Sequence, residues 1–384
     1  AQQFPGGDHF LVQWVGTRIF ITGGINPYRP EANEKIGILA EKYLGKTESG
    51  DLRFVSPIYS VLFYLPFLAI PDFILARAIW LTFQQGALIL QIILCIRLVN
   101  WKPGWSGLLF LLLFGLFGYQ SFLSMLNGDL VILAGLCVVG GLLAMKSGGD
   151  ELAGVLFAFA TIKLHMVYLF IIFVILWGIR QRRWGVVAWF FITIFLFSLS
   201  FTLLTPEWFI EYLRQVVGFL KEYQAGTLAD MLSGVFPGSG SRVGWLVMFI
   251  VLFITMFEWW LANKKTFRSF LWTACLTLAA NQWLSVRVDA RNGILLLPAL
   301  VLVFGLWQER WHFFGRINYW ISLLLLFGLP YLVYITQFAR PARQEGLLAL
   351  ILPLFLMITL YWVRWWAVTP VNLWFDQLSN PSLP

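Results

Sequence analysis

The sequence predicts an all-α protein that crosses a membrane many times. Hydrophobic residues occupy 59% of its 384 positions and only 12% are charged, about half the charged share of a typical soluble domain. The apolar residues fall in blocks of about 20, the length that a helix needs to cross the hydrocarbon core of a bilayer. Many of the 20 tryptophans lie at block ends, as is typical of residues at the membrane–water interface.

Residues 1–71 are expected to form a loop with interfacial helices. Two amphipathic stretches, Phe10 to Thr22 and Pro30 to Leu44, are short enough to lie at a membrane interface. A third stretch, from Pro57 to Ile70, has too few residues to cross comfortably. We predict that this third stretch is interfacial or re-entrant.

Residues 72–366 form the predicted transmembrane domain, followed by a cytoplasmic tail at 367–384. Full spans are expected at about 72–99, 104–123, 129–145, 152–178, 184–204, 242–262, 267–286, 290–307, 317–337 and 345–366. The stretch 152–178 is predicted to be two shorter helices broken near Lys163, because an unpaired lysine at the bilayer centre is costly. Counting it as two gives about eleven transmembrane helices.

Short basic clusters between the spans set the predicted orientation. When the cluster at 180–183 is placed in the cytoplasm, as the positive-inside rule favours, the basic loops near 97–102, 146, 264–268 and 310–316 fall on the same side. The long polar segments 1–56 and 205–241 then lie outside. We predict a multi-pass plasma membrane protein. The formal net charge of +8 comes from these scattered clusters and does not indicate a nucleic-acid partner.

Motifs for metal, disulfide or nucleotide binding do not appear in the sequence. The three cysteines lie within apolar stretches, without metal or disulfide spacing. No HExxH, CxxC, Walker or GxGxxG pattern is present. The sequence therefore predicts no metal site and no cofactor.

On this topology, the outer face collects the polar residues that packing explains least. They come from four segments: Asp8 and His9, then Asn127-Gly128-Asp129, then Lys163 and His165, and finally Arg287, Asp289, Arg291 and Asn292. Plainer interpretations stay open, since Asp8 suits a helix cap and 127–129 suits a turn. The two arginines also suit anchoring to lipid headgroups. Lys163 fits a plain interpretation least, because an intramembrane ionisable residue is a functional candidate by default.

A carboxylate beside several cations suits sugar transfer from a lipid phosphate. The carboxylate takes the proton of the acceptor hydroxyl as the sugar carbon is attacked. Lysine and arginine stabilise the negative charge that grows on the leaving lipid phosphate. Such donors require no nucleotide-binding fold.

Six short motifs occur in order over about the first 180 residues. They are Gly7-Asp8, Gly23 to Tyr28, Val55 to Tyr59, Ala76 to Trp80, Asn127 to Asp129 and Thr161 to Lys163. Together they resemble the GT-C-fold glycosyltransferases, and more narrowly the polyprenyl-phosphate-mannose-dependent α-mannosyltransferases of glycosyltransferase family 87. The sequence departs from the family pattern at Asp129, at Leu164 and at the single proline Pro57, where that family has Gln, Pro and a proline pair.

The resemblance implies that Asp8 is the catalytic base and that Lys163 contacts the donor phosphate. It also implies a leading transmembrane helix before Asp8. His9 is a second candidate catalytic residue. Arg287 and Arg291 are expected to bind the donor phosphate together with Lys163. The residues expected to position the substrate are Asn26, Tyr28, Tyr59, Asn127, Asp129 and His165.

We therefore expect an inverting membrane glycosyltransferase that moves a sugar, mannose by resemblance, from a polyprenyl phosphate to a lipid or glycan acceptor at the outer face. Its expected partners are these substrates and membrane lipids. Two other classes stay open. A non-catalytic subunit of a larger membrane assembly would fit the altered motifs, whereas a transporter or flippase would require inverted repeats, which the sequence does not show.

Overall fold

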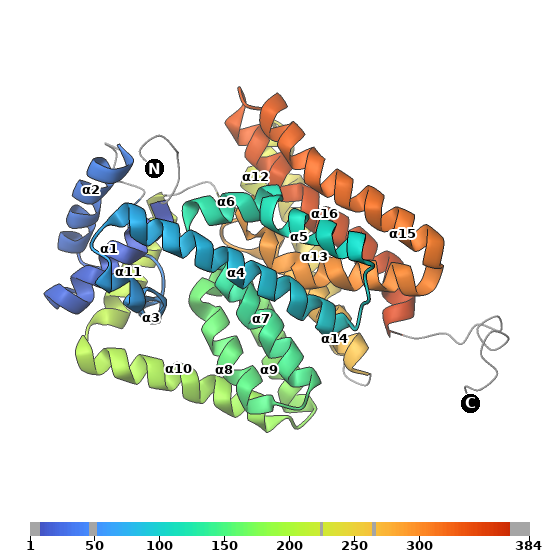
Figure 1. Ribbon diagram of the computed structural model, residues 1–384, viewed down its shortest axis with the longest axis horizontal. Coiled ribbons are helices and arrows are strands. Elements are labelled where there is room, and N and C mark those ends of the chain that lie inside the picture. The colour runs from blue at the N-terminus through green and yellow to red at the C-terminus, as the bar shows by residue number, and fades with distance from the viewer. Residues whose placement is uncertain (1–7, 46–51, 223–225, 263–265, 369–384) are drawn as a thin grey trace.

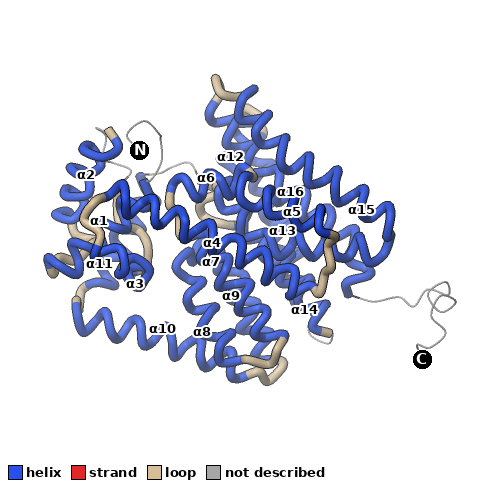
Figure 2. Tube along the Cα trace, in the orientation of Figure 1, coloured by secondary structure: helices blue, strands red, loops and turns tan. Residues whose placement is uncertain are grey.

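The computed structural model describes residues 8–45, 52–222, 226–262 and 266–368, and in these ranges every regular element is a helix (Figures 1 and 2). The tail 369–384 lies outside the described residues. The first elements are α1 (Asp8–Gly23), α2 (Pro30–Leu44), η2 (Ile58–Ser60), α3 (Val61–Tyr64) and η3 (Leu65–Ala69). The next are α4 (Phe73–Val99), α5 (Trp105–Phe117), α6 (Tyr119–Asn127), α7 (Val131–Lys146), α8 (Asp150–Ala160), η4 (Thr161–Lys163) and α9 (Leu164–Arg180). The last are α10 (Trp184–Leu204), α11 (Trp208–Glu222), α12 (Leu228–Val235), α13 (Gly240–Leu261), α14 (Phe267–Leu284), η6 (Ala290–Leu296), α15 (Leu297–Thr336) and α16 (Pro341–Val368).

Helix α1 lies inside the protein, and the expected amphipathic character of residues 10–22 is wrong, because its buried residues cover nearly all faces of the helix. Every side chain from Phe10 to Val15 is buried. The ring of Phe10 stacks on Trp80 of α4 with centroids 5.8 Å apart, and the Trp14 indole donates to the Phe67 carbonyl over 3.2 Å. The reason is that α1 is apolar on several faces, and such a helix is stable only when other elements surround it.

Helix α2 has the amphipathic character that the sequence predicts. Its buried residues, Ala32, Ile36 and Ala40, recur every four positions and form one face. Pro30 begins the helix, and Gly45 ends it in the left-handed region with φ +66°, as is usual for a helix C-terminus.

The two long polar segments lie against each other, with α11 beside α1 and α2 (Figure 1). Arg29 forms ion pairs with Glu207 at 3.1 Å and with Glu211 at 3.3 Å. The rings of Tyr28 and Tyr212 have centroids 5.4 Å apart. The segments that the loop charges assign to one side of the membrane are therefore packed together.

Seven stretches of the described residues are long and apolar enough to cross a membrane, or eight if α5 and α6, which meet at 45°, form one bent span. The expected count of about eleven transmembrane helices is not confirmed. Helix α7 has only 16 residues, and α14, with its buried Thr273, Thr277 and Asn281, is less apolar than a span that faces lipid. Helix α14 is instead enclosed by its neighbours.

The predicted break at Lys163 is the apex of a helical hairpin. By length and composition Asp150–Arg180 counts as one stretch, but Asp150 pairs with Arg183 and the rings of Phe157 and Phe170 are 5.4 Å apart. A straight helix would separate these two phenylalanines by about 20 Å. Helices α8 and α9 therefore run in opposite directions, and η4 joins them.

Helix α15 also reverses direction. The rings of Phe304 and Tyr319 have centroids 4.9 Å apart, whereas a straight helix would separate them by about 22 Å. Gly315 approaches the Trp307 backbone so closely that any added Cβ would collide with it. The two predicted spans on either side are present as Ala290–Trp311 and Phe313–Thr336.

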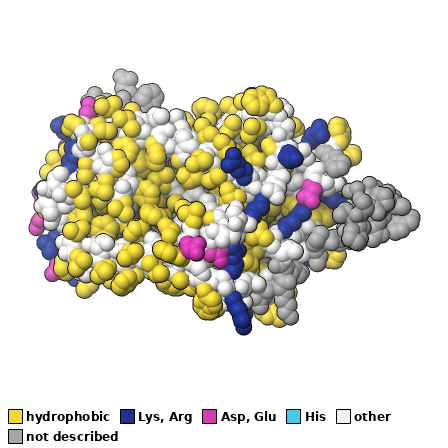
Figure 3. Space-filling model, turned by 60° about the horizontal axis from the view of Figure 1, so that its bottom comes forward, with side chains coloured by type: hydrophobic (Ala, Val, Ile, Leu, Met, Phe, Trp, Pro, Cys, Tyr) yellow, Lys and Arg dark blue, Asp and Glu magenta, His cyan; other side chains and the backbone are white. Residues whose placement is uncertain are grey.

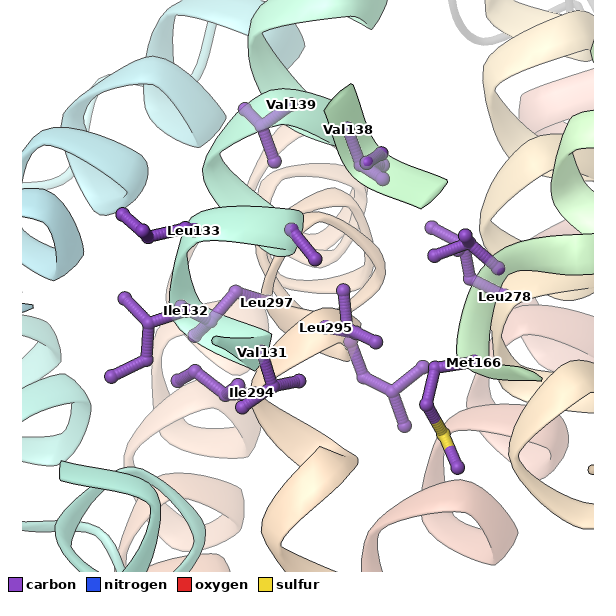
Figure 4. Close-up of a cluster of buried hydrophobic side chains, with 14 of the residues drawn as sticks. Val131, Ile132, Leu133, Val138, Val139, Met166, Leu278, Ile294, Leu295 and Leu297 are labelled. Atoms are coloured by element: carbon purple, nitrogen blue, oxygen red, sulfur yellow. The ribbon is translucent and has the colours of Figure 1, made fainter. Parts of the chain in front are cut away.

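The core of the membrane domain surrounds α7. Figure 4 shows Val131 and Ile132 of α7 beside Ile294 of η6, and Leu295 of η6 on the side of Met166 of α9 and Leu278 of α14. In contrast, only 17% of an 18-residue stretch of α13 and 28% of such a stretch of α10 is buried within the protein. Large apolar areas therefore reach the surface, as Figure 3 shows in yellow, which is the surface expected of helices that contact lipid.

Glu258 of α13 is a buried carboxylate outside the predicted site residues. Arg364 of α16 donates to both of its oxygens over 2.9 Å, and the Tyr361 hydroxyl donates to it over 3.2 Å. These bonds compensate the charge within the helix bundle and give Glu258 a structural role.

Candidate active site

The four polar segments singled out in the sequence come together in the structure. Lys163 Nζ lies 2.7 Å from Asp129 Oδ1, and His9 Nε2 lies 3.5 Å from Arg291 Nη1. Arg291 Nε donates to Asp289 over 2.7 Å, and His9 also interacts electrostatically with Asp129, Lys163 and Asp289. We call this group the polar cluster; its members are Asp8, His9, Asp129, Lys163, His165, Asp289 and Arg291.

The turn at Gly128 allows α1 to reach the cluster. Gly128 ends α6 with φ +72°, and its N–H bonds to the carbonyls of Ser124 and Met125. A Cβ added there would lie 2.5 Å from the Cβ of Phe10. Glycine is therefore required twice, for the left-handed backbone and for the close approach that places Asp8 and His9 beside Asp129.

We expect Gly128→Ala to destabilise the protein by about 2–5 kcal/mol, adding a left-handed backbone penalty to an overpacking penalty. Gly148→Ala is the matched control, because Gly148 has φ +82° but no neighbour within 4 Å of an added Cβ. The Gly148→Ala variant should lose only the stability that the left-handed backbone costs, about 1–2 kcal/mol. Thermal unfolding of both variants measures the difference, and equal losses would contradict the close contact with Phe10.

Three side chains of α4 fix this turn by binding its carbonyl groups. Arg77 donates to the Leu126 carbonyl over 3.2 Å, Trp80 to that of Gly128 over 3.2 Å and Gln84 to that of Asp129 over 2.6 Å. Spacings of three and four residues place the three donors on one face of the helix. We call Arg77, Trp80 and Gln84 the α4 ladder.

Lys163 and Asp129 form an ion pair that is largely removed from water, with side-chain exposures of 13% and 5%. Asp129 also accepts from the Val131 N–H over 3.2 Å at the start of α7. Burial alone would raise the pKa of Asp129, but Lys163, His9 and Arg291 outweigh burial and hold that pKa well below its usual range. Asp129 is thus a carboxylate that orients Lys163.

His9 is neutral at neutral pH. Desolvation lowers its pKa from 6.5 to about 4, and the positive charges of Lys163 and Arg291 act in the same direction, against Asp129 and Asp289. A neutral imidazole next to Asp8 has a nitrogen that accepts a proton or a hydrogen bond.

The lowered pKa of His9 predicts a loss of stability in mild acid. Between pH 6.5 and about 4 the unfolded chain binds a proton at His9 that the folded chain does not, so stability falls as pH falls through this window, by at most about 3 kcal/mol. His9→Gln should show a smaller fall. Thermal unfolding of both proteins from pH 7 to pH 4 tests this, and parallel curves would contradict it.

Asp289 and Arg291 lie at the start of η6. Asp289 accepts from the Arg291 backbone N–H over 2.9 Å and pairs with its guanidinium. Burial would raise the pKa of Asp289, but Arg291 outweighs it and lowers that pKa. The Ser124 hydroxyl donates to the Arg291 carbonyl over 2.8 Å, which ties η6 to α6.

Arg287 lies at the edge of the cluster, towards the second polar segment. Its guanidinium lies 5.4 Å from the centre of the Phe219 ring of α11, and it interacts electrostatically with His165. Next to it, the Val288 N–H donates to the Gly226 carbonyl over 2.6 Å. Segment 205–241 is therefore packed directly beside the cluster.

The residues predicted to position a substrate divide into two groups. His165 lies in the polar cluster, and Asn127 ends α6 directly before the Gly128 turn. Asn26 and Tyr28 instead hold their own segment together.

Asn26 accepts from the Tyr28 N–H over 3.1 Å, and the Tyr28 hydroxyl donates to the Ser56 carbonyl over 2.7 Å. The Tyr59 hydroxyl lies 2.6 Å from Thr161 Oγ1 and supports η4. Asn26, Tyr28 and Tyr59 therefore make hydrogen bonds within the protein that stabilise their own segments.

Two charged residues of the site were not among the predicted site residues. Arg77, only 6% exposed, interacts electrostatically with Asp8, and Asp289 pairs with Arg291. An arginine one turn inside an apolar span is an intramembrane charge, and this signal was sufficient to single out Arg77. Within the described ranges, no three His, Cys, Asp or Glu side chains are grouped to hold a metal ion.

A polytopic helical membrane protein with an acid–base cluster between its polar segments and its core belongs to the class of membrane-embedded enzymes. The family model for glycosyltransferase family 87 matches residues 54–284, more than half of the chain. The chain belongs to this family and is a membrane glycosyltransferase. Comparisons with curated proteins and with solved structures gave no match. The matched region includes Asp129, Lys163 and the α4 ladder, and it stops just before Asp289 and Arg291.

Proposed function

We propose that this glycosyltransferase moves a sugar from a polyprenyl-phosphate donor to a hydroxyl of a lipid or glycan acceptor, with inversion at the anomeric carbon. The observation that carries the proposal is the position of Asp8 and His9 beside two cations, Lys163 and Arg291. A base and a phosphate-binding pair are the two functions that such a transfer requires. Mannose is the sugar that the resemblance to polyprenyl-phosphate-mannose enzymes supports.

In the proposed reaction, Asp8 takes the proton of the acceptor hydroxyl while its oxygen attacks the anomeric carbon. The bond from that carbon to the phosphate oxygen breaks, and the lipid phosphate leaves with the electron pair. A single displacement of this kind inverts the anomeric centre. His9, which is neutral and faces Arg291 Nη1 with its acceptor Nε2, donates a hydrogen bond from Nδ1–H to the acceptor or to the sugar.

Lys163 and Arg291 stabilise the charge on the leaving phosphate. An ammonium has three donor hydrogens and a guanidinium has five, more than the pairs with Asp129 and Asp289 use. Arg291 turns Nε and Nη2 towards Asp289 and Nη1 towards His9, so its Nη1 edge faces the proposed reaction centre. Arg287 lies where it would extend this positive surface towards α11.

We further propose that the cluster faces the outside of the plasma membrane. The mutual packing of segments 8–45 and 205–222 supports a common side for them. The basic loops near 97–102, 180–183 and 310–316 favour the cytoplasm for the opposite side.

Transfer of radiolabel from polyprenyl-phosphate mannose by the purified protein tests the proposal. Extracted membrane lipids and glycans serve as the acceptor pool, and the anomeric configuration of the product reports inversion. Transfer from a different lipid-linked sugar would correct the donor while keeping the reaction. Absence of transfer with every member of a panel of lipid-linked sugars and acceptors would contradict the proposed reaction.

A further inference from the structure

A cavity of about 570 Å³ lies at the opposite end of α4 from the polar cluster. The end of α4, the end of α7, the start of α14 and the middle of α15 form its walls. Val99 lies 22 residues after Arg77 along α4, which corresponds to about 33 Å, close to the thickness of a bilayer core. The cavity is therefore separate from the proposed reaction centre, at the other membrane boundary.

The cavity carries an excess of positive charge. Four basic residues line it against a single carboxylate, Glu309; they are Lys102, Lys146, Arg268 and Arg316. Figure 3 shows dark-blue basic side chains gathered on the right-hand part of the molecule, towards the end where α14 and α15 lie in Figure 1. An anion is the ligand that such a lining favours.

Two of these cations are held in place by the fold. Lys146 Nζ donates to the carbonyls of Arg97 and Leu98 and to Asn100 Oδ1 over 2.7–3.0 Å. Arg268 donates twice to Glu309, over 3.1 and 2.7 Å. Lys102 and Arg316 are exposed at the cavity, so the lining combines a fixed positive wall with two accessible charges.

Most of the remaining lining residues are apolar. Leu98, Leu271, Leu302 and Leu306 line the cavity together with Trp101, whose indole donates to Gln308 over 2.8 Å. A free phosphate ion makes no use of such a wall, whereas a phospholipid places its headgroup on the cations and its first methylene groups on the leucines.

We propose that this cavity binds the phosphate headgroup of an anionic glycerophospholipid. Lys102 and Arg316 contact the phosphate, and the proximal acyl chains lie against the leucine wall. Basic pockets between transmembrane helices at a membrane boundary are suited to such headgroups. This inference does not depend on the proposed sugar transfer, because its test measures lipid binding.

The test compares lipid binding to the full chain and to the double variant Lys102→Gln/Arg316→Gln. The purified protein is titrated with phosphatidylglycerol or phosphatidylcholine in mixed micelles, and bound lipid is counted by native mass spectrometry. Wild type should prefer phosphatidylglycerol, and the double variant should bind it about 30-fold more weakly, from a loss of about 1 kcal/mol per removed charge. Lys102→Arg/Arg316→Lys, which keeps both charges, should bind like wild type.

Arg180→Gln is the matched control, since Arg180 is exposed at the end of α9 and outside the cavity lining. It should bind phosphatidylglycerol like wild type. An equal loss in this control, or unchanged binding in the double variant, would overturn the proposal. Competition by free glycerol phosphate at the same concentration as the lipid would also overturn it, by showing that a soluble phosphate is the ligand.

Discussion

Asp8→Asn is expected to lower the rate of sugar transfer by about 10²–10⁴-fold, the usual contribution of a general base. Asparagine has nearly the same shape as aspartate but cannot accept the proton of the acceptor hydroxyl. The substitution removes an interaction made in the transition state, so kcat and kcat/KM should fall together. Initial rates of label transfer at several donor concentrations measure both constants.

Glu31→Gln is the control for this substitution, because Glu31 is an exposed carboxylate on α2 of the same polar segment. It should leave the rate unchanged. Both variants should unfold close to the wild-type temperature. An Asp8→Asn protein that is folded and transfers sugar at the wild-type rate would rule out Asp8 as the base.

Lys163→Met is expected to reduce both stability and transfer. Asp129 is buried, and removing its partner leaves an uncompensated charge, which costs about 3–5 kcal/mol. Transfer should fall further than the loss of folded protein explains, because the leaving phosphate loses its ammonium group. Thermal unfolding and transfer per folded molecule measure the two effects separately.

The double variant Lys163→Met/Asp129→Asn distinguishes structure from catalysis. Neutralising Asp129 removes the buried charge, so much of the lost stability should return. Transfer should stay low, since no cation is restored at the phosphate. If transfer returns together with stability, the only function of Lys163 is to balance Asp129.

The arrangement of the site was largely accessible from sequence, because helix order and loop charge constrain which segments share a membrane boundary. Placing Asp8, Asp129, Lys163 and Arg291 on one side required only the spans and the positive-inside rule. The structure adds that Lys163 is paired with Asp129. That pairing depends on the contact between η4, which joins α8 to α9, and the turn after α6. No local sequence pattern predicts such a contact.

The errors have a common physical origin. The sequence analysis interpreted residues 10–22 as amphipathic because it considered that stretch alone, whereas Phe10 and Trp14 are buried against α4 and residues 58–69. It predicted a full span at 267–286, whereas the structure encloses α14 within the bundle, where its Asn281 accepts from the Leu169 N–H over 2.9 Å. Both outcomes depend on neighbours that are distant in the chain.

The α4 ladder has a consequence for how this site tolerates sequence drift. Arg77, Trp80 and Gln84 donate to backbone carbonyls of the turn. Because every amino acid has a backbone carbonyl, these hydrogen bonds do not depend on which side chains stand at positions 126 and 127. Substitutions at these two positions leave the bonds of the ladder in place, so the backbone that carries Asp129 keeps its shape. The sequence constraint applies instead to α4. Loss of one of its three donors leaves a carbonyl of the turn without its hydrogen bond, whichever residues form the turn.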